Sequence, residues 1–478
     1  MAIPHPPHHF TVAMPSWNAL YQVRDFGYRV QDVRAVGDIT ANPGSPIPKL
    51  DKQTWSVEYP PAGVPETRDV DVSYTIDWND PGPFNSQIND HHAFVNLAEI
   101  LMYVPDRRSE DTEVTFEDVP ANWRIVSELP AGKEPNSFTA FSYDALVDAP
   151  VEAGNFDESA FDNAGAHFRV IVDAADWNNS HRNKLEDALR RITSYEMQLM
   201  GGPPFKEYTF FFHIGSQDAV GGGGMEHANS CAIASTSPDR ALYIAAHEFF
   251  HAWSVRRIRP QALEPVDYTR EQYTRALWFA EGVTSTYGTY ALERTGLWSK
   301  NQFYGDLAGQ VCELQARPAR LWQSVEESSL DAWFEKYDAY NAPDRSISYY
   351  NKGQILGVML DLSIRYVTDN RKSLDDVLRR MNDEYAKAGK FYDESKGVRR
   401  AVEEVTGQSY EDFFRRYVSG THEIPYADYL PLAGLDAKIE GSATMVRATE
   451  PHCSITESSH PSDRQRRIRE GLLRGETN

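Results

Sequence analysis

The chain has little cysteine and no long hydrophobic run, and each of these absences excludes a class of protein. Three of its 478 residues are cysteines, and their odd number and wide spacing form neither a disulfide framework nor a cysteine zinc site. We expect Cys231 and Cys312 to be buried free thiols, which is compatible with a reducing cytoplasm. No run of about 18 apolar residues occurs, so the sequence predicts no membrane-spanning helix.

Basic residues are also scarce. The chain has 48 Lys and Arg against 70 Asp and Glu, a formal charge of −22, which opposes binding to nucleic acid or to an anionic membrane. Residues 1–13 are rich in proline and histidine, and we expect them to form a flexible leader. They lack the basic and apolar regions of a signal peptide, so the sequence as it stands predicts a cytoplasmic protein. A periplasmic or secreted location would require an N-terminal signal that is missing here.

The most informative segment is His-Glu-Phe-Phe-His at residues 247–251. On a helix, positions i and i+4 share a face, so His247 and His251 can offer two imidazoles to one metal ion. Glu248 lies beside the first histidine, where a carboxylate can take a proton from water. The preceding residues 241–246 are apolar and contain no helix breaker, which is typical of a helix that enters a buried site.

A third metal ligand is expected downstream, because zinc in hydrolases usually takes three protein ligands and keeps a fourth position for water. Glu281 follows Trp278 and Phe279 in an otherwise apolar run. A bare carboxylate is costly to bury in such surroundings unless a cation lies nearby. The alternative, a solvated glutamate on a helix face, fits poorly with the two aromatic residues that precede it.

Four glycines at 221–224 precede Met225 and Glu226. Alone they would indicate a flexible loop, but glycines also let a backbone approach a ligand closely. A carboxylate beside them can hold a free α-amino group. We therefore take Gly223, Gly224, Met225 and Glu226 as candidate substrate-binding residues.

Tyr350 lies at the start of an apolar helix predicted to end at Val367. A tyrosine phenol is protonated at neutral pH and can donate a hydrogen bond to a developing oxyanion. Most tyrosines at helix starts only pack, so position alone does not favour a catalytic role for this one.

Taken together and in this order, these segments resemble the glycyl aminopeptidase family of zinc metallopeptidases. That family is related to the larger aminopeptidase N-like group of gluzincins, whose catalytic domain is thermolysin-like. The likeness covers roughly residues 14 to 430, and the combined set of motifs is far more specific than any one of them. The matching segments are Gly-Gly-Met-Glu-His at 223–227, His-Glu-Phe-Phe-His-Ala-Trp at 247–253, Arg-Arg-Ile-Arg-Pro at 256–260, Trp-Phe-Ala-Glu-Gly at 278–282, Tyr-Tyr-Asn-Lys-Gly at 349–353 and, near the N-terminus, Tyr-Gln-Val-Arg-Asp-Phe at 21–26.

The resemblance implies an aminopeptidase that acts on peptides with a free N-terminus and prefers N-terminal glycine and alanine. It implies the following roles: one Zn²⁺ per chain bound by His247, His251 and Glu281, activation of water by Glu248, binding of the substrate α-ammonium by Glu226, and stabilisation of the oxyanion by Tyr350. Ser254 and Arg256 depart from the family pattern outside the metal ligands. The oligomeric state stays open.

The sequence predicts a multi-domain α+β fold. Period-two segments such as residues 70–76 predict an N-terminal antiparallel β domain over 14–155. A strand–helix alternation over 156–300 fits a thermolysin-like zinc domain, and a helical bundle over 301–430 would close the cleft. Residues 431–478 contain few apolar positions and many charges, so we expect a flexible, truncated or divergent remnant of the PDZ-like domain common in the family.

Three alternatives stay open. A non-catalytic descendant could keep the fold as a peptide-binding module, and a zinc endopeptidase would share the chemistry without needing Glu226. A His₂Glu site can also accept cobalt or manganese.

His91 and His92 could suggest a second metal site, but no nearby carboxylate or cysteine spacing supports one, and we interpret them as structural. We expect Arg256, Arg257 and Arg259 to form structural ion pairs rather than to bind a substrate carboxylate.

Overall fold

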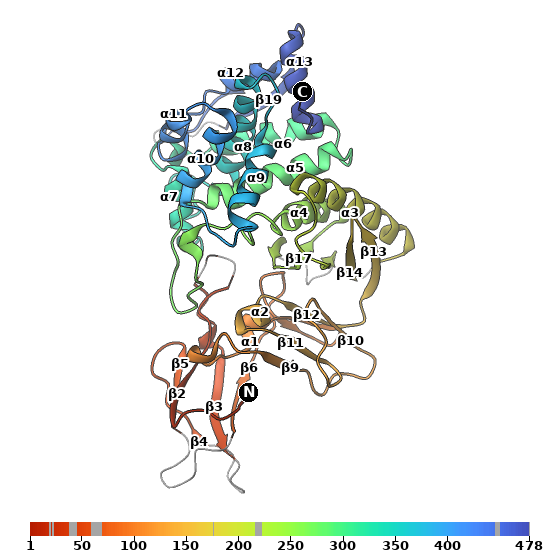
Figure 1. Cartoon of the computed structure of the whole chain (residues 1–478), viewed down its shortest axis with the longest axis vertical. Helices are drawn as coiled ribbons and strands as arrows, with labels where there is room; N and C mark the ends of the chain where they lie inside the picture. The colour runs from red at the N-terminus through yellow and green to blue at the C-terminus, as the bar shows by residue number, and fades with distance from the viewer. Residues whose placement is uncertain are drawn as a thin grey trace.

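The computed structural model describes residues 1–18, 21, 23–37, 45–58, 69–174, 176–215, 222–444 and 450–477. Gln22 and Gly221, which belong to two of the motifs above, lie outside this part of the chain. The protein is a multi-domain α+β structure in which an N-terminal β region, a mixed five-stranded sheet and a helical region follow one another along the long axis (Figure 1). No helix in the described ranges is long and apolar enough to span a membrane.

The N-terminal region consists of small antiparallel sheets. The predicted strand at residues 70–76 is β6, and its buried positions alternate with exposed ones at its start, as a half-buried strand requires. Trp55, Val57, Val70 and Val72 belong to the core of this region. Its main strands are β1 (Ala2–Ile3), β2 (His9–Ala13), β3 (Val30–Gly37), β5 (Thr54–Glu58), β6 (Val70–Ile76), β7 (Gln87–Ile88), β8 (His92–Asn96), β9 (Thr112–Thr115), β10 (Arg124–Ser127), β11 (Ser137–Ala140) and β12 (Pro150–Gly154).

The prediction of a flexible leader over residues 1–13 is wrong. Strand β1 pairs with β6, and β2 pairs with β5 over five residues. Phe10 and Val12 of β2 are buried in the core. Prolines and histidines dominate the composition of this segment, but its apolar residues alternate, and that alternation decides the structure.

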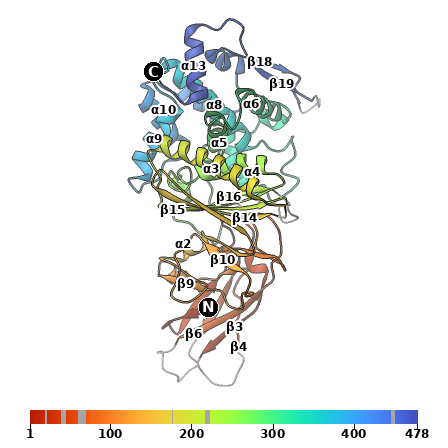
Figure 2. The same cartoon turned by 90° about the vertical axis from the view of Figure 1, so that its right-hand side faces the viewer.

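A five-stranded sheet with the order β13-β14-β15-β17-β16 occupies the middle of the molecule. Its three inner strands are parallel, and both edge strands are antiparallel to their neighbours. Helices α3 (Asn179–Met200) and α4 (Pro238–Phe250) lie on one face, and the N-terminal region lies beneath the other (Figure 2). The strands are β13 (Asp157–Asn163), β14 (Ala166–Ala174), β15 (Glu207–Ile214), β16 (Gly223–Glu226) and β17 (Ser230–Ser235).

The C-terminal half is mainly helical and shares one continuous apolar core with the five-stranded sheet. The helix predicted over 350–367 is α8, capped by the side chain of Ser348. Helix α7 ends at Leu330, and a short 3₁₀ segment follows it. The main helices are α5 (Thr284–Arg294), α6 (Lys300–Gln315), α7 (Val325–Leu330), α8 (Tyr349–Val367), α9 (Leu374–Met381), α10 (Glu394–Thr406) and α13 (Asp463–Arg474).

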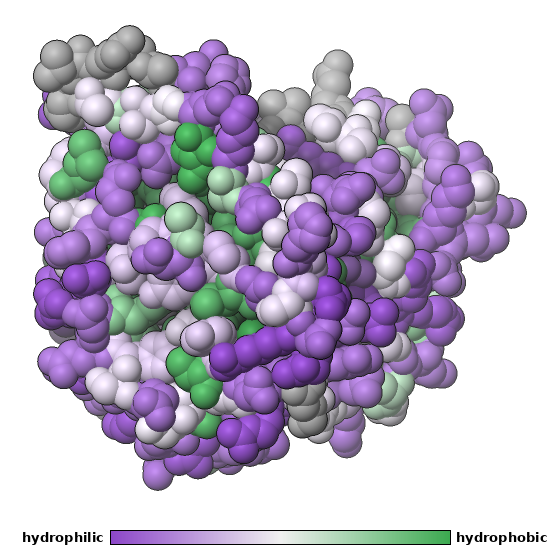
Figure 3. Space-filling model, turned by 90° about the horizontal axis from the view of Figure 1, so that it is seen from above, coloured by the Kyte–Doolittle hydropathy of each residue, from purple (hydrophilic) through white to green (hydrophobic). Residues whose placement is uncertain are grey.

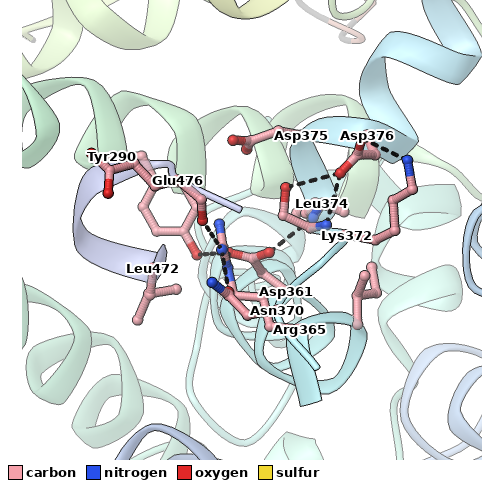
Figure 4. A network of polar contacts seen from close by, with 12 residues as sticks. Tyr290, Asp361, Arg365, Asn370, Lys372, Leu374, Asp375, Asp376, Leu472 and Glu476 are labelled. Atoms are coloured by element: carbon pink, nitrogen blue, oxygen red, sulfur yellow. Dashed lines mark hydrogen bonds and ion pairs between the residues drawn. The ribbon is translucent and has the colours of Figure 1, made fainter. Parts of the chain in front are cut away.

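The prediction of a flexible tail is also wrong for the described part of 431–478. Strands β18 (Leu435–Glu440) and β19 (His452–Glu457) form a hairpin, and Ile468 and Leu472 of α13 are fully buried. Near the chain end, the buried Arg365 donates to the carbonyl of Glu476 at 2.8 Å, within a network that includes Asp361 (Figure 4). The origin of residues 431–478 in a PDZ-like domain stays a prediction.

The cysteine prediction is half right. Cys231 is a buried free thiol, as expected. Cys312 is not free, because it forms a disulfide with Cys453 and so joins α6 to the hairpin strand β19. The surface of this end of the molecule is largely hydrophilic, with small apolar areas between the polar ones (Figure 3).

Candidate active site

Helix α4 carries the His-Glu-Phe-Phe-His segment. Ser237 caps its start by accepting from the backbone of Arg240, and Pro238 occupies the first turn, where no backbone donor is needed. The helix ends at Phe250 with His251 as its C-cap residue, so the candidate metal-binding segment forms its last turn. His247, Glu248 and His251 are 8%, 6% and 1% exposed.

The three predicted metal ligands converge. Nε2 of His251 lies 3.0 Å from Nε2 of His247. The Oε2 atom of Glu281 lies 3.1 Å from Nε2 of His251 and 3.4 Å from Nε2 of His247. Glu281 reaches this point from a π-helical turn, Trp278–Val283, and such turns are frequent at functional sites.

The outer nitrogen of each imidazole is held by the protein. Nδ1 of His251 lies 2.9 Å from the carbonyl oxygen of Ser254, and Nδ1 of His247 lies 3.2 Å from the hydroxyl of Ser285. The Ser285 hydroxyl donates to the carbonyl of Glu281, so it is free to accept from the imidazole. These contacts favour a proton on Nδ1 of each ring, so that the Nε2 atoms are the ones that could donate lone pairs to a bound metal. The sequence analysis missed this role of Ser285, although a residue four positions after Glu281 shares its helix face.

Two close backbone approaches require glycine. A Cβ on Gly224 would lie 2.3 Å from Cγ of Glu248, so β16 packs its bare backbone against this glutamate. A Cβ on Gly353 would lie 2.2 Å from the carbonyl oxygen of Trp278, so α8 packs directly on the π-helical turn. The first contact fixes the position of Glu248, and the second brings the start of α8 to the ligands.

The electrostatics of the cluster favour a bound cation. Burial raises the pKa of Glu248 well above its usual range, and the negative charges of Glu226 and Glu281 add to this effect. Although burial disfavours a charged imidazole, the Glu281 carboxylate raises the pKa of His251 to about 10. Three buried carboxylates thus surround two imidazoles. This donor set, with both Nε2 atoms aimed at one carboxylate, fits zinc.

A cavity of about 560 Å³ lies over the cluster. The predicted site residues that line it are Gly223, Gly224, Glu226, His247, Glu248, His251, Glu281 and Tyr350. The carboxylate of Glu226 lies within 4.8 Å of ligand atoms of Glu248 and His251. Met225 is buried, however, and lines a neighbouring cavity instead.

Tyr350 lies at the start of α8 with its ring centroid 6.1 Å from that of His247. The phenol is 38% exposed. Partial desolvation, and then the negative charge of Glu281, raises the pKa of the phenol well above its usual value. The hydroxyl therefore stays protonated and can act as a hydrogen-bond donor toward the cavity.

The N-terminal region supplies part of the cavity wall, which the sequence analysis did not anticipate. Arg24, Phe84 and Asn85 line the cavity, and Arg24 donates to the Phe84 carbonyl at 2.5 Å and to the Asn85 side chain. The expected structural ion pairs are present for two of the three arginines: Arg256 pairs with Asp148 at 2.6 Å, and Arg259 pairs with Glu264 at 2.6 Å. Arg257 donates to backbone carbonyls.

Comparisons with protein families find two matches. Residues 240–356 match the family described as M61 glycyl aminopeptidase. Residues 1–155 match the Peptidase M61 N-terminal domain. A search of curated proteins found no match.

Solved structures share the fold. An aminopeptidase N family protein from Idiomarina loihiensis is 23% identical, with a TM-score of 0.84; the match covers 92% of this chain and 76% of the other. An M1 zinc metallopeptidase from Deinococcus radiodurans is 15% identical, with a TM-score of 0.50 and 88% of each chain covered. Aminopeptidase A from Legionella pneumophila is 15% identical, with a TM-score of 0.50 over 86% of this chain and 45% of the other.

Proposed function

Because the chain belongs to the M61 glycyl aminopeptidase family, we propose that it is a zinc-dependent aminopeptidase that removes small N-terminal residues, glycine and alanine, from peptides. The observation that carries the proposal is the convergence of His247, His251 and Glu281 beneath a cavity that also holds Glu226 and Glu248. The small-residue preference rests on family membership. A peptide substrate is supported by a relative, since a mutant of the Deinococcus radiodurans enzyme was crystallised with a Tyr-Ser-Ala substrate.

In this proposal, His247, His251 and Glu281 hold one zinc ion. When bound, the zinc supplies Lewis-acid chemistry that polarises the scissile carbonyl and favours ionisation of water. The hydrogen bonds to Nδ1 of both histidines keep the imidazoles oriented for this task.

The remaining steps fall to side chains of the cavity. Glu248 takes a proton from the attacking water and passes it to the leaving amine, and its raised pKa suits a group that must hold that proton. Glu226 pairs with the substrate α-ammonium and so places the first peptide bond at the cluster. Tyr350 donates a hydrogen bond to the developing oxyanion.

The domain assignment belongs to the same proposal. We assign residues 1–155, which include strands β1 and β2, to the β domain, 156–300 to a thermolysin-like zinc domain and 301–430 to a helical bundle. The parallel inner strands under α4 and the delivery of Tyr350 by α8 support this division.

Hydrolysis of glycyl- and alanyl-p-nitroanilide tests the proposal, with Glu248→Gln as the paired variant. We expect turnover by the zinc-loaded wild type and a loss of about 10²–10⁴-fold in kcat in the variant, the range typical of a general base. A folded, zinc-loaded wild type without turnover would refute the catalytic proposal and favour a peptide-binding module. Equal hydrolysis of N-acetylated and free substrates would indicate an endopeptidase.

A further inference from the structure

A second cluster of metal-ligand side chains lies between the N-terminal region and the five-stranded sheet. Nδ1 of His92 lies 2.9 Å from Oε1 of Glu152, and Nε2 of His213 lies 2.9 Å from Oε2 of the same carboxylate. All three residues are buried: His92 is 2% exposed, Glu152 1% and His213 3%. Oδ2 of Asp173 lies 3.7 Å from Nδ1 of His92, and this side chain is 27% exposed.

Strand register brings these four residues together. In the N-terminal sheet, β8 and β12 pair so that Phe94 lies opposite Glu152, which puts His92 and Glu152 on one face. In the five-stranded sheet, β14 and β15 pair in parallel with Asp173 beside His213. One pair from each sheet therefore meets across the interface where the N-terminal region lies beneath the five-stranded sheet (Figures 1 and 2).

We infer that His92, Glu152, His213 and Asp173 form a second zinc site, which joins the N-terminal region to the catalytic sheet. Two imidazoles and two carboxylates supply the four nitrogen and oxygen ligands that a tetrahedral zinc ion takes when no position is left for water. The catalytic cluster offers three ligands and an adjoining cavity instead. This site raises the expected zinc content from one ion per chain to two.

The geometry of the catalytic cluster provides an internal comparison. There, imidazole nitrogens lie 3.1 and 3.4 Å from a Glu281 oxygen. The ligand atoms of His247, His251 and Glu281 all lie within 4.8 Å of one another, and so do those of His92, Glu152 and His213. The imidazole centroids are 5.3 Å apart for His92 and His213 and 4.7 Å apart for the catalytic pair. The two clusters thus have the same ligand types at similar spacing.

Charge also favours a cation at this place. Glu152 is almost fully buried, and among the described residues its ion pairs are with His92 and His213 alone. A neutral pair of imidazoles would leave the Glu152 carboxylate as a buried negative charge, which is costly. A divalent cation compensates both carboxylates and leaves each imidazole neutral.

The sheet interface around the site is apolar. Phe94, Val126, Phe156, Ile171, Phe211 and Ala232 form a small separate core between the sheets. The ring of Phe94 packs edge-on against His213 at 4.9 Å. A Cβ on Gly154 would lie 2.9 Å from Cβ of His92, so the neighbouring strand leaves room only for the imidazole.

The test is the zinc content of the purified full-length protein after zinc loading and gel filtration, measured by elemental analysis. We expect two ions per chain in the wild type and one in the double variant His247→Ala/His251→Ala. Adding His213→Gln to that double variant should remove the remaining ion. Glutamine keeps a hydrogen-bond donor for Glu152 but is a poor zinc ligand, so a purely hydrogen-bonded role would leave the metal content unchanged. His91→Gln, at the exposed neighbouring histidine, is the matched control and should retain both ions.

A second readout does not depend on counting. In the His247→Ala/His251→Ala background, zinc should raise the thermal midpoint, and the further His213→Gln change should abolish that rise. A wild type with one ion per chain would overturn the inference, as would a folded double variant that binds none. If the double variant fails to fold, the comparison of wild type with His213→Gln alone decides: two ions against one supports the site, and equal counts overturn it.

Discussion

The role of Glu226 gives the sharpest test of exopeptidase specificity. Glu226 is 7% exposed, and its carboxylate lies within 4.8 Å of ligand atoms of Glu248 and His251. A substrate ammonium about 4 Å from such a carboxylate gains roughly 4 kcal/mol at an effective dielectric of about 20. Glu226→Gln should therefore lower kcat/KM for glycyl-p-nitroanilide by about 10³-fold, since each ~1.4 kcal/mol is a factor of ten.

A thermodynamic cycle that changes both the enzyme and the ligand separates the loss of this charge pair from a general disturbance of the active site. Inhibition constants are measured for glycinamide and N-acetylglycinamide against wild type and Glu226→Gln, so the result does not depend on turnover of a blocked substrate. We expect the substitution to weaken the binding of glycinamide strongly and the binding of N-acetylglycinamide only slightly. Glu335 also lines the cavity, and Glu335→Gln is the matched control, with an expected change below about tenfold.

If Glu226→Gln weakened the binding of both compounds equally, Glu226 would not be the partner of the substrate ammonium, because an uncharged ligand cannot lose a charge pair. If Glu335→Gln weakened glycinamide binding more than Glu226→Gln does, Glu335 would be the better candidate for binding the substrate ammonium. In either case the metal cluster and Glu248 would still support peptide hydrolysis.

Three further changes probe the surroundings of the site. Gly224→Ala places a methyl group where Glu248 lies, so kcat should fall by about 10²-fold or more with an unchanged circular dichroism spectrum; normal turnover would contradict the close packing. Ser285→Ala removes the hydroxyl that holds one imidazole, and a chelator competition should record a loss of about 10–100-fold in zinc affinity. Cys453→Ser removes a disulfide with a sequence separation of 141 residues, which by chain entropy contributes up to about 5 kcal/mol to the free energy of unfolding. Urea unfolding should show this loss of stability, and dithiothreitol should produce the same loss in the wild type. An unchanged unfolding midpoint would contradict the Cys312–Cys453 disulfide.

The parts of the site that follow local rules were predictable from the sequence. His247 and His251 are one helical turn apart, so their shared face follows from the helix alone. Glu281 was found because a carboxylate in an apolar run needs a partner. The strand at 70–76 and the helix at 350–367 follow from periodicity, and the structure confirms both.

The parts that depend on distant pairing were not predictable. His92 lies 60 residues from Glu152, and only the register of two sheets brings them together with His213. The disulfide joins cysteines 141 residues apart, a pairing that spacing cannot reveal. The tail was misjudged by composition, although Ile468 and Leu472 are spaced as one face of a helix.

The N-terminal region contributes in two different ways to the surroundings of the two candidate metal sites. This region lines the active-site cavity with Arg24, Phe84 and Asn85, and it also meets the five-stranded sheet at the interface that contains His92 and Glu152. A zinc ion at that interface would set the distance between the cavity wall and the catalytic cluster without touching the substrate. Loss of that ion should therefore raise KM for peptides that reach the N-terminal wall more than it lowers kcat for glycyl-p-nitroanilide, which we expect to occupy only the end of the cavity beside His247, His251 and Glu281. Equal effects of His213→Gln on both substrates would separate the second site from substrate positioning and restrict it to holding the fold.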